Sequence, residues 1–222
     1  MSEPQSNAER LALLEADNRR LRQLLEQRGV PADLRHRLRH TVAVFRTIIR
    51  KSAETAQDLE SYVAHVEDRM DALMRIQAAI DDLGSVDLHT LLADELQQYG
   101  ALEGELVTLS GPEVQLDPRS SQVLALAVHE LAVNALEHGP LAAPGGALEV
   151  GWTIDSGEEQ SPILALTWKE RGLRAAAEPS RQGFGTEVLT RMLPYDLQGR
   201  TVLTFEPDGL RCTIHIPLRT SR

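Results

Sequence analysis

The sequence predicts an α+β protein with an N-terminal coiled-coil segment at residues 1–30, a helical hairpin at 31–83 and a C-terminal α/β sandwich at 84–222. Two observations predict this class. Apolar residues recur at three- and four-residue steps up to about residue 80, which is typical of helices. After the run "DDLGSVD" at 81–87, segments of alternating polarity that are typical of strands appear among further helical segments. Helices combined with antiparallel strands are typical of the α+β class.

The first segment, about residues 7–28, carries a heptad pattern. Its a and d positions are Leu11, Leu14, Asn18, Leu21 and Leu25. An asparagine at an a position fixes the register and the number of strands in a coiled coil. Three heptads are marginal, and the segment favours a short dimeric coiled coil over a lone helix. The run "GVP" at 29–31 interrupts it.

Two long helices are expected next. The first runs from about Asp33 into the fifties, and its buried face comprises Leu34, Leu38, Val42, Phe45, Ile48, Ile49 and Ser52. The second runs to about Ile80, with Leu59, Val63, Val66, Met70, Leu73 and Ile76 at helical spacing. Few breaker residues separate the two helices, which indicates a helical hairpin. Two hairpins would complete a four-helix bundle, so we expect a homodimer.

The C-terminal domain mixes helices with strands. Strands are expected at 147–155, 162–170, 200–205 and 209–217. Helices are expected at about 88–99, 118–138 and 185–193, where they would cover one face of the sheet. The strands at the end of the domain are expected to be antiparallel.

Composition and charge favour a soluble globular protein and argue against one class of function. Apolar content of 42% and charged content of 25% are ordinary for a soluble globular protein, and the formal net charge of −10 argues against a nucleic-acid binder. Within residues 33–51, however, only Asp33 is acidic, and the basic residues are Arg35, Arg37, Arg39, Arg46, Arg50 and Lys51. This segment is typical either of a site for an acidic partner or of a solvated helix face.

The location of the protein is also constrained. The N-terminus has no apolar core of signal-peptide length, and no apolar run is long enough to span a bilayer. Cys212 is the only cysteine, so an intrachain disulfide is excluded and a reducing compartment is expected. We therefore expect a cytoplasmic protein without membrane insertion.

The run "HELAVNALEHG" at 129–139 places polar side chains in an otherwise apolar helix. A helical zinc-protease pair needs histidines four residues apart, but Val133 stands at that place, so this reading fails. Glu130, Asn134 and His138 recur at i, i+4 and i+8 and therefore form one polar stripe. The stripe is either a solvated helix face or part of a polar site. Glu130 and Asn134 carry oxygen atoms that suit magnesium when phosphates and water complete its shell.

His36 lies in the run "LRHRLRHTVAVF". Leu34 and Leu38 lie two positions to either side of it, about 200° around the helix in each direction. His36 is therefore expected to point away from the buried face, toward water. An exposed imidazole keeps a nitrogen lone pair available at neutral pH and can act as a nucleophile. Taken alone, the position is also that of an ordinary surface histidine.

Two further motifs lie in the C-terminal domain. In "WKERG" at 168–172, alternation places Trp168 and Glu170 on one side of a strand, an aromatic ring beside an acceptor for an exocyclic amine. The alternative is a core tryptophan with an unrelated acid. In "GFG" at 183–185, glycines before a helix let the backbone approach a phosphate, and the free N–H groups of the helix start favour an anion. Turn glycines are common, so this motif is weak by itself.

Four stretches together resemble one known family. The runs "LRHRLRHTVAVFRTIIRKSA", "HELAVNALEHGPLAAPGG", "TWKERG" and "GFGTEVLTRMLPYDLQGR" are similar to those of the HWE histidine kinases of bacterial two-component signalling. That family is named for a histidine in its asparagine box and for a Trp-x-Glu motif, and His129, Trp168 and Glu170 stand in those places. The resemblance runs in order from about residue 31 to 218.

The resemblance implies a C-terminal ATP-binding domain of the Bergerat (GHKL) type, the sandwich shared with gyrase and Hsp-type ATPases. It implies that His36 accepts the phosphoryl group, that Asn134 binds Mg²⁺ and that Glu130 is the adjacent acid that supports the metal or a water. Glu170 takes the place of the aspartate that recognises adenine in related kinases. The other ATP-binding positions that it implies are His129, His138, Trp168, Gly172, Gly183 and Gly185. A response-regulator receiver domain is the implied partner, and positioning and charge neutralisation are the main demands of such phosphoryl transfer.

The sequence departs from the family pattern at several places. His40 stands where the family usually has an asparagine, and Glu137 stands where a lysine is common. The glycine doublet after the Trp-x-Glu motif is reduced to Gly172 and Leu173, and the coiled-coil segment stands in place of the usual sensor domain. Two alternatives stay open: a non-catalytic adaptor or phosphotransfer module that keeps the fold, and an anti-sigma-type serine kinase on the same ATP fold.

Overall fold

The computed structural model describes residues 16, 20, 32–56, 58–142, 145–156, 162–172 and 183–218. The chain divides into two compact units, Met1–Arg50 and Lys51–Arg222. The predicted coiled-coil segment falls outside the described residues, apart from Ala16 and Arg20. Among the helices of the described ranges, none is long and apolar enough to cross a membrane. The domain boundaries after residues 30 and 83 stay predictions.

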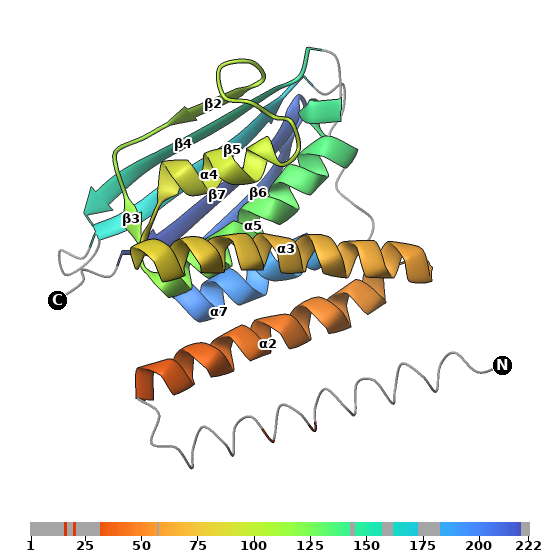
Figure 1. The fold of residues 1–222 in the computed structure, drawn as a ribbon. Coiled ribbons are helices and arrows are strands. Elements are labelled where there is room, and N and C mark those ends of the chain that lie inside the picture. The colour runs from red at the N-terminus through yellow and green to blue at the C-terminus, as the bar shows by residue number, and fades with distance from the viewer. Residues whose placement is uncertain are drawn as a thin grey trace. The chain divides into compact units, whose positions relative to one another are not determined.

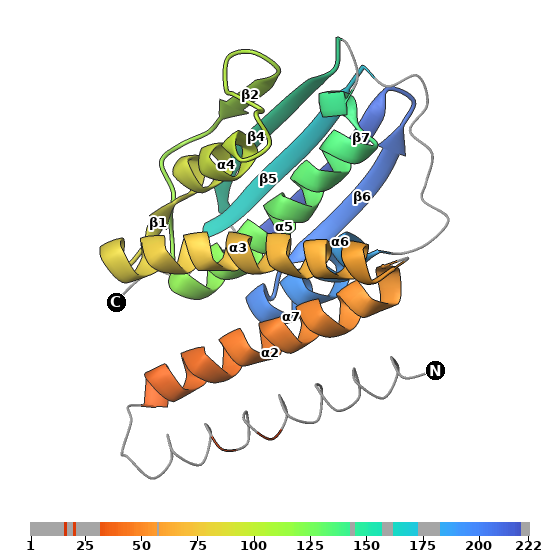
Figure 2. The same ribbon diagram turned by 45° about the vertical axis from the view of Figure 1, so that its right-hand side comes forward.

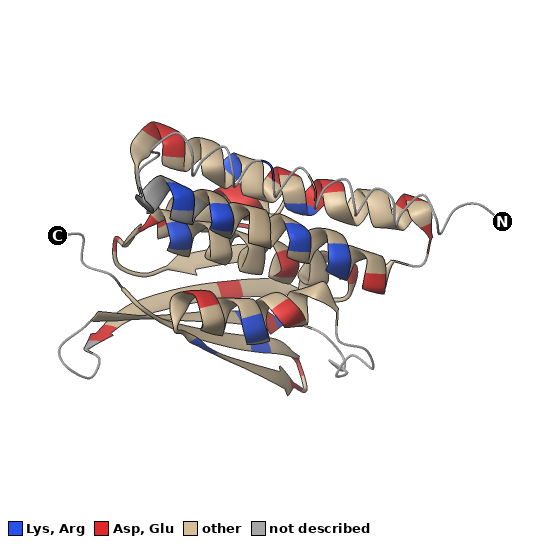
Figure 3. Cartoon of the chain, turned by 90° about the horizontal axis from the view of Figure 1, so that it is seen from below, with Lys and Arg blue, Asp and Glu red and all other residues tan. Residues whose placement is uncertain are grey.

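Helix α2, Ala32–Thr55, confirms the first of the two predicted long helices and contains His36. Lys and Arg recur along it, whereas Asp33 and Glu54 are its only acidic residues (Figure 3). The basic character that the sequence indicates therefore belongs to one continuous helix.

Helix α3, Leu59–Leu83, confirms the second predicted helix. It begins at a capping box, in which the Asp58 carboxylate accepts a hydrogen bond from the N–H of Ser61 and the Ser61 hydroxyl accepts one from the N–H of Asp58. It ends at Gly84, whose φ of 76° lies in the left-handed region that glycine adopts at low cost. Its buried face comprises Arg69, Ala72, Leu73, Ile76 and Ile80.

A five-stranded sheet forms one layer of the second unit. Its strands are β2 (Val107–Ser110), β4 (Ala147–Ser156), β5 (Pro162–Arg171), β6 (Arg200–Glu206) and β7 (Gly209–Pro217). The order across the sheet is β2-β4-β5-β7-β6. The pairs β4–β5, β5–β7 and β6–β7 are antiparallel, which confirms the predicted antiparallel strands, whereas β2 pairs in parallel with β4.

Helices cover one face of this sheet (Figures 1 and 2). They are α4 (Leu88–Gln97), α5 (Pro118–Glu137) and a continuous run of α6 (Phe184–Glu187), the π-helix η3 (Val188–Met192) and α7 (Leu193–Leu197). The Asp117 carboxylate caps α5 by accepting from the N–H groups of Arg119 and Ser120, and Pro118 follows at the first helical position. The three predicted helices are confirmed, except that the last continues to Leu197.

Several elements of the fold were not predicted. β2 adds an edge strand, β1 (Val86–Asp87) pairs with β3 (Gln115–Leu116), and a short helix η1 (Pro140–Ala142) follows α5. These elements have two to four residues each, too few for a recognisable period. Leu59 and Val63 keep the helical spacing of α3, yet both side chains are exposed.

The core lies between the sheet and its helices. Along β5 every second side chain is buried: Leu164, Leu166, Trp168 and Glu170. This alternation confirms that Trp168 and Glu170 lie on the same side of the strand. The apolar side of α5 is fully buried and comprises Leu124, Ala127, Val128, Leu131, Ala132 and Ala135. The polar residues of α5 are thereby held at the boundary of a packed core.

Candidate functional site

The polar run of α5 divides into buried and exposed side chains. His129 and Glu130 are buried, with 2% and 5% of their surface exposed, whereas Asn134 and His138 are exposed. The stripe of Glu130, Asn134 and His138 is therefore not a solvated helix face throughout, because Glu130 is buried. A buried carboxylate requires a cation or hydrogen-bond donors in the protein interior.

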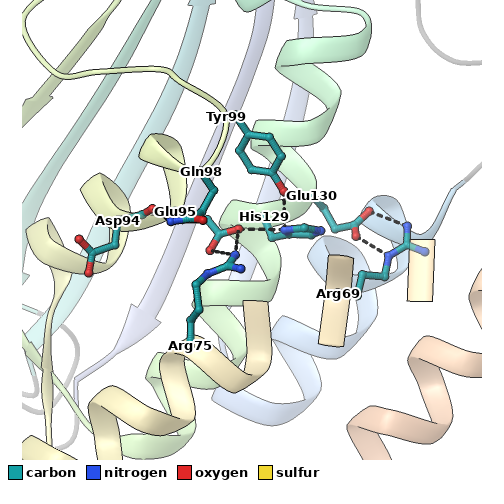
Figure 4. Close-up of polar contacts among 8 residues, drawn as sticks. All are labelled: Arg69, Arg75, Asp94, Glu95, Gln98, Tyr99, His129 and Glu130. Atoms are coloured by element: carbon teal, nitrogen blue, oxygen red, sulfur yellow. Dashed lines mark hydrogen bonds and ion pairs between the residues drawn. The ribbon is translucent and has the colours of Figure 1, made fainter. Parts of the chain in front are cut away.

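Arg69 of α3 is the partner of Glu130 (Figure 4). Its Nε donates to Oε1 at 2.6 Å and its Nη2 to Oε2 at 3.2 Å, so the two planar groups form a bidentate pair. Nη1 of Arg69 donates to the Ser52 hydroxyl at 2.7 Å. The guanidinium carbon also lies 4.2 Å from the ring centre of the buried Phe184, a cation–π contact. These contacts fix the direction in which the Glu130 carboxylate points.

Gly185 lies against the same part of α5. A Cβ atom added at Gly185 would lie 3.1 Å from Cβ of Glu130, 3.3 Å from its Oε2 and 3.3 Å from Nδ2 of Asn134. The missing side chain thus lets the backbone approach α5 closely. Gly183 differs, because a Cβ atom there would meet nothing within 4 Å. Two motifs that are far apart in the sequence are brought together here.

His129 takes part in a second polar network (Figure 4). Its Nδ1 lies 2.9 Å from Oε1 of Glu95 and 2.8 Å from the Tyr99 hydroxyl. Nη2 of Arg75 donates to both oxygens of Glu95, at 3.1 and 2.9 Å. Burial acts to raise the pKa of Glu95, but the bonds from His129 and Arg75 outweigh it, so this pKa is lowered. Burial and the charge of Glu95 raise the pKa of Tyr99 far above its ordinary value, which keeps the phenol protonated.

Trp168 and Glu170 are buried neighbours on β5, and the indole Nε1 donates to Oε1 of Glu170 at 3.2 Å. Burial raises the pKa of Glu170, and the bond from Trp168 offsets this only in part. A Cβ atom at Gly209 would lie 2.3 Å from the backbone oxygen of Glu170, so only glycine fits there. Gly172 directly follows β5. Its φ is 93°, and a Cβ atom there would lie 2.9 Å from the backbone oxygen of Gly145. A buried carboxylate with a raised pKa is typical of functional sites.

Other residues of the predicted site stand apart from these contacts. His36 lies in α2, in the other unit, and its side chain is outside what the structure describes. His138 is the C-cap of α5, and its Nε2 lies 3.7 Å from the carboxylate of the exposed Glu137. The roles of His36, His129 and His138 toward a nucleotide stay predictions.

The donor set of this site fits one kind of metal ion. In the described parts of the chain, no three His, Cys, Asp or Glu side chains gather in a way that could hold a metal. Asn134, which is exposed, could offer its one amide oxygen to a metal ion. Mg²⁺ accepts such a site when phosphate oxygens and water fill its remaining positions, whereas zinc requires three or four protein ligands. The oxygens of Asn134 and Glu130 are of the kind that Mg²⁺ prefers.

Sequence reasoning missed four residues of the two networks: Arg69, Arg75, Glu95 and Tyr99. A signal for two of them exists. Arg69 lies at the same helical spacing as the buried apolar residues of α3, and Glu95 lies among the buried leucines of α4. A charged residue at a position that should be apolar requires an opposite charge nearby. The spacing does not identify that partner.

Comparison with known proteins supports the family that the sequence motifs resemble. Residues 33–113 match a family model described as HWE histidine kinase. The blue-light-activated histidine kinase 1 of Erythrobacter litoralis is 30% identical over 200 residues, which cover 86% of this chain and 54% of that protein. The blue-light-activated histidine kinase of Rhizobium johnstonii is 30% identical over 210 residues, covering 94% and 56%. The chain thus spans about half the length of the curated relatives it matches.

Solved structures share the fold. The histidine kinase domain of the Erythrobacter litoralis EL346 blue-light activated histidine kinase has a TM-score of 0.55 at 18% identity, covering 81% of this chain and 84% of that one. A second structure of the EL346 kinase has a TM-score of 0.59 at 15% identity, covering 85% and 61%. At these identities the likeness concerns the fold alone.

Proposed function

Because this chain belongs to the HWE histidine kinase family, we propose that it is an ATP-dependent protein histidine kinase. In this proposal it phosphorylates itself on His36 and then transfers the phosphoryl group to an aspartate of a response-regulator receiver domain. A cytoplasmic location belongs to the same proposal, because ATP is a cytoplasmic substrate.

The close approach of Gly185 to Glu130 and Asn134 is the observation that carries the nucleotide site. It brings the glycine segment, whose backbone a phosphate can approach, next to the residues suited to a metal ion bound to that phosphate. Asn134, which is exposed, would bind Mg²⁺ through its amide oxygen, and Glu130 would support the metal or a water. The ion supplies neutralisation of the phosphate charge, which is the main requirement of phosphoryl transfer.

Trp168 and Glu170 form the adenine end of the proposed site. The indole N–H bonds to one carboxylate oxygen, which leaves further acceptor capacity on Glu170 because a carboxylate has about four lone-pair sites. That capacity suits the exocyclic amine of adenine. Gly172 belongs to the same end, since its φ of 93° turns the chain directly after β5.

The helical part of the chain supplies the phosphoacceptor. Residues 31–83 would form a hairpin for dimerisation and phosphotransfer, and residues 1–30 a short coiled coil in the same homodimer. The basic residues of α2 around His36 suit a receiver domain, whose phosphoacceptor site is acidic (Figure 3).

Phosphorylation with ATP labelled on its γ-phosphate tests the function. We expect label that is lost in acid and kept in base, as phosphohistidine requires. His36→Ala should lose the label while its ATP affinity, measured by calorimetry, stays unchanged. His89→Ala is the control, because it removes a histidine that is exposed in the unit that carries the nucleotide motifs. Label in His36→Ala at the wild-type level would contradict the assignment.

One observation favours the non-catalytic adaptor as the second candidate. Both oxygens of Glu130 accept hydrogen bonds from Arg69, so this acid is engaged within the protein. An adaptor would bind ATP weakly or not at all and would take no label. Acid-stable label would instead indicate a serine kinase.

A further inference from the structure

His129 is a buried imidazole with two oxygen neighbours on the same nitrogen. An unprotonated Nδ1 could accept from the Tyr99 hydroxyl, but its lone pair would then face the Glu95 carboxylate. A protonated Nδ1 donates to Glu95 and has the Tyr99 oxygen as a second neighbour. Because Glu95 is held as a carboxylate by Arg75 and can only accept, the Nδ1 that lies 2.9 Å from it must carry a proton to form this hydrogen bond.

Two successive interactions, Arg75–Glu95 and Glu95–His129, join three helices. Arg75 comes from α3, Glu95 from α4 and His129 from α5, and the bonds run through them without interruption. Successive residues of a helix point about 100° apart, so His129 and Glu130 face different neighbours. Fixing His129 on α4 therefore resists a rotation of α5 about its own axis. Such a rotation would carry Glu130 and Asn134 away from Gly185.

We propose that His129 is a positioning residue that acts through Glu95 and Arg75, and that it does not bind the nucleotide itself. Its Nδ1–H holds α5 in the rotation at which Glu130 and Asn134 face Gly185. This proposal rests on the proposed function, because it concerns how the nucleotide site is held in place. It assigns the same positioning role to Glu95 and Arg75, which support the ligand-bearing helix α5 from outside the site.

The protonation of the ring is the first test, and it does not depend on kinase activity. Nitrogen-15 spectra of the full chain should show His129 with a proton on Nδ1 at neutral pH, assigned by its disappearance in His129→Asn. A neutral ring with its proton on Nε2 would overturn the proposal. If wild-type protein took no label from ATP while Nδ1 was protonated, the proposed function would fail and the assignment of the hydrogen bond would stand.

Two amide variants form the second test. The side-chain nitrogen of asparagine lies as many bonds from the backbone as Nδ1, and that of glutamine as many as Nε2. We expect His129→Asn to keep Mg²⁺–ATP affinity and labelling within a few-fold of wild type. His129→Gln should lower them by about 10- to 100-fold, the range for residues that orient metal ligands. Melting temperatures should fall in both variants, because both lose the ring.

The relative effects of His129→Asn and His129→Gln distinguish a positioning role of His129 from direct contact with the nucleotide and from core filling. Better function in His129→Gln than in His129→Asn would indicate a contact made by Nε2, and losses that only follow melting temperature would indicate core filling; either result overturns the proposal. Glu95→Gln should lower Mg²⁺–ATP affinity, and adding it to His129→Gln should cause little further loss, because both changes break one device. Additive losses would show that the two residues act separately.

Discussion

Arg69 of α3 and Glu130 of α5 form a bidentate ion pair across 61 positions of the sequence, with N–O distances of 2.6 and 3.2 Å. Their side chains are only 9% and 7% exposed. The pair ties α3 directly to α5, the helix that carries Glu130 and Asn134 of the proposed nucleotide site. An interior carboxylate of this kind is stable only while its cation stays in place.

Replacement of Arg69 by methionine should destabilise the protein strongly, because it leaves Glu130 buried without a cation. We expect a loss of about 3–5 kcal/mol in the free energy of unfolding, measured with urea. Arg69→Met combined with Glu130→Met should recover much of that loss, since apolar replacement of a whole buried pair is often nearly neutral. Arg171→Met is the control: its pair with Glu149 is about half exposed, and its loss should be about 0–1 kcal/mol. Equal losses in Arg69→Met and Arg171→Met would contradict this account.

The parts of the fold that repeat a period could be predicted from the sequence. β5 has alternating polarity, so its start, its end to within one residue and the shared side of Trp168 and Glu170 followed from the local pattern alone. α5 combines a cap at Asp117, a proline at its first position and a long apolar face, all of which are local signals. For the same reason, these elements carry the motifs by which the family resemblance could be recognised.

The polar networks could not be predicted, because they depend on which helices meet. Arg69 and Glu95 break the apolar faces of their own helices, and this is visible in the sequence. The choice of Glu130 and His129 as their partners is set by the packing of α3 and α4 against α5, which no local period encodes. β2 was missed for a similar reason: it has four residues, and its partner β4 follows only after α5.

Gly185→Ala should impair the proposed nucleotide site more than the fold. The new Cβ atom would lie 3.1 Å from Cβ of Glu130, which its bonds to Arg69 hold in place, so α6 must move away from α5. We expect a loss of about 1–3 kcal/mol in unfolding free energy, the usual cost of overpacking, together with weaker Mg²⁺–ATP binding by calorimetry. Gly183→Ala has open space and should cost only what alanine costs in place of glycine at the N-cap of α6, which is less than the cost of Gly185→Ala. Equal stability of the two variants would show that the close approach has no consequence.

Asn134→Ala should remove magnesium-dependent ATP binding while leaving the fold intact. The side chain is exposed on α5, and its loss should change stability by no more than about 0.5 kcal/mol. Calorimetric titration with ATP in the presence and absence of Mg²⁺ measures the effect. Gln122→Ala, a polar-to-alanine change on the same helix but away from Gly185, is the control and should bind as wild type does. Unchanged affinity in Asn134→Ala would move the metal site elsewhere.

Glu95→Gln should make the protein less stable in a manner that depends on pH. The pKa of Glu95 is lowered in the folded state, although burial alone would raise it, because His129 and Arg75 donate to the carboxylate. Its stabilising effect is therefore present above the ordinary pKa of a glutamate and is lost as the pH falls through the folded-state value. At neutral pH we expect Glu95→Gln to cost about 1.5–3 kcal/mol, the worth of hydrogen bonds to a charged group. Urea unfolding at a series of falling pH values should show wild type and variant converging in acid.

Glu149→Gln makes the same chemical change at an exposed ion pair and is the control for this experiment. Its effect should stay within about 0–1 kcal/mol at every pH, because water screens that pair with Arg171. A difference between wild type and Glu95→Gln that stayed constant from neutral to acid pH would mean that the cost arises from packing of the amide. In that case the charge that links Arg75, Glu95 and His129 would not stabilise α5 against α4.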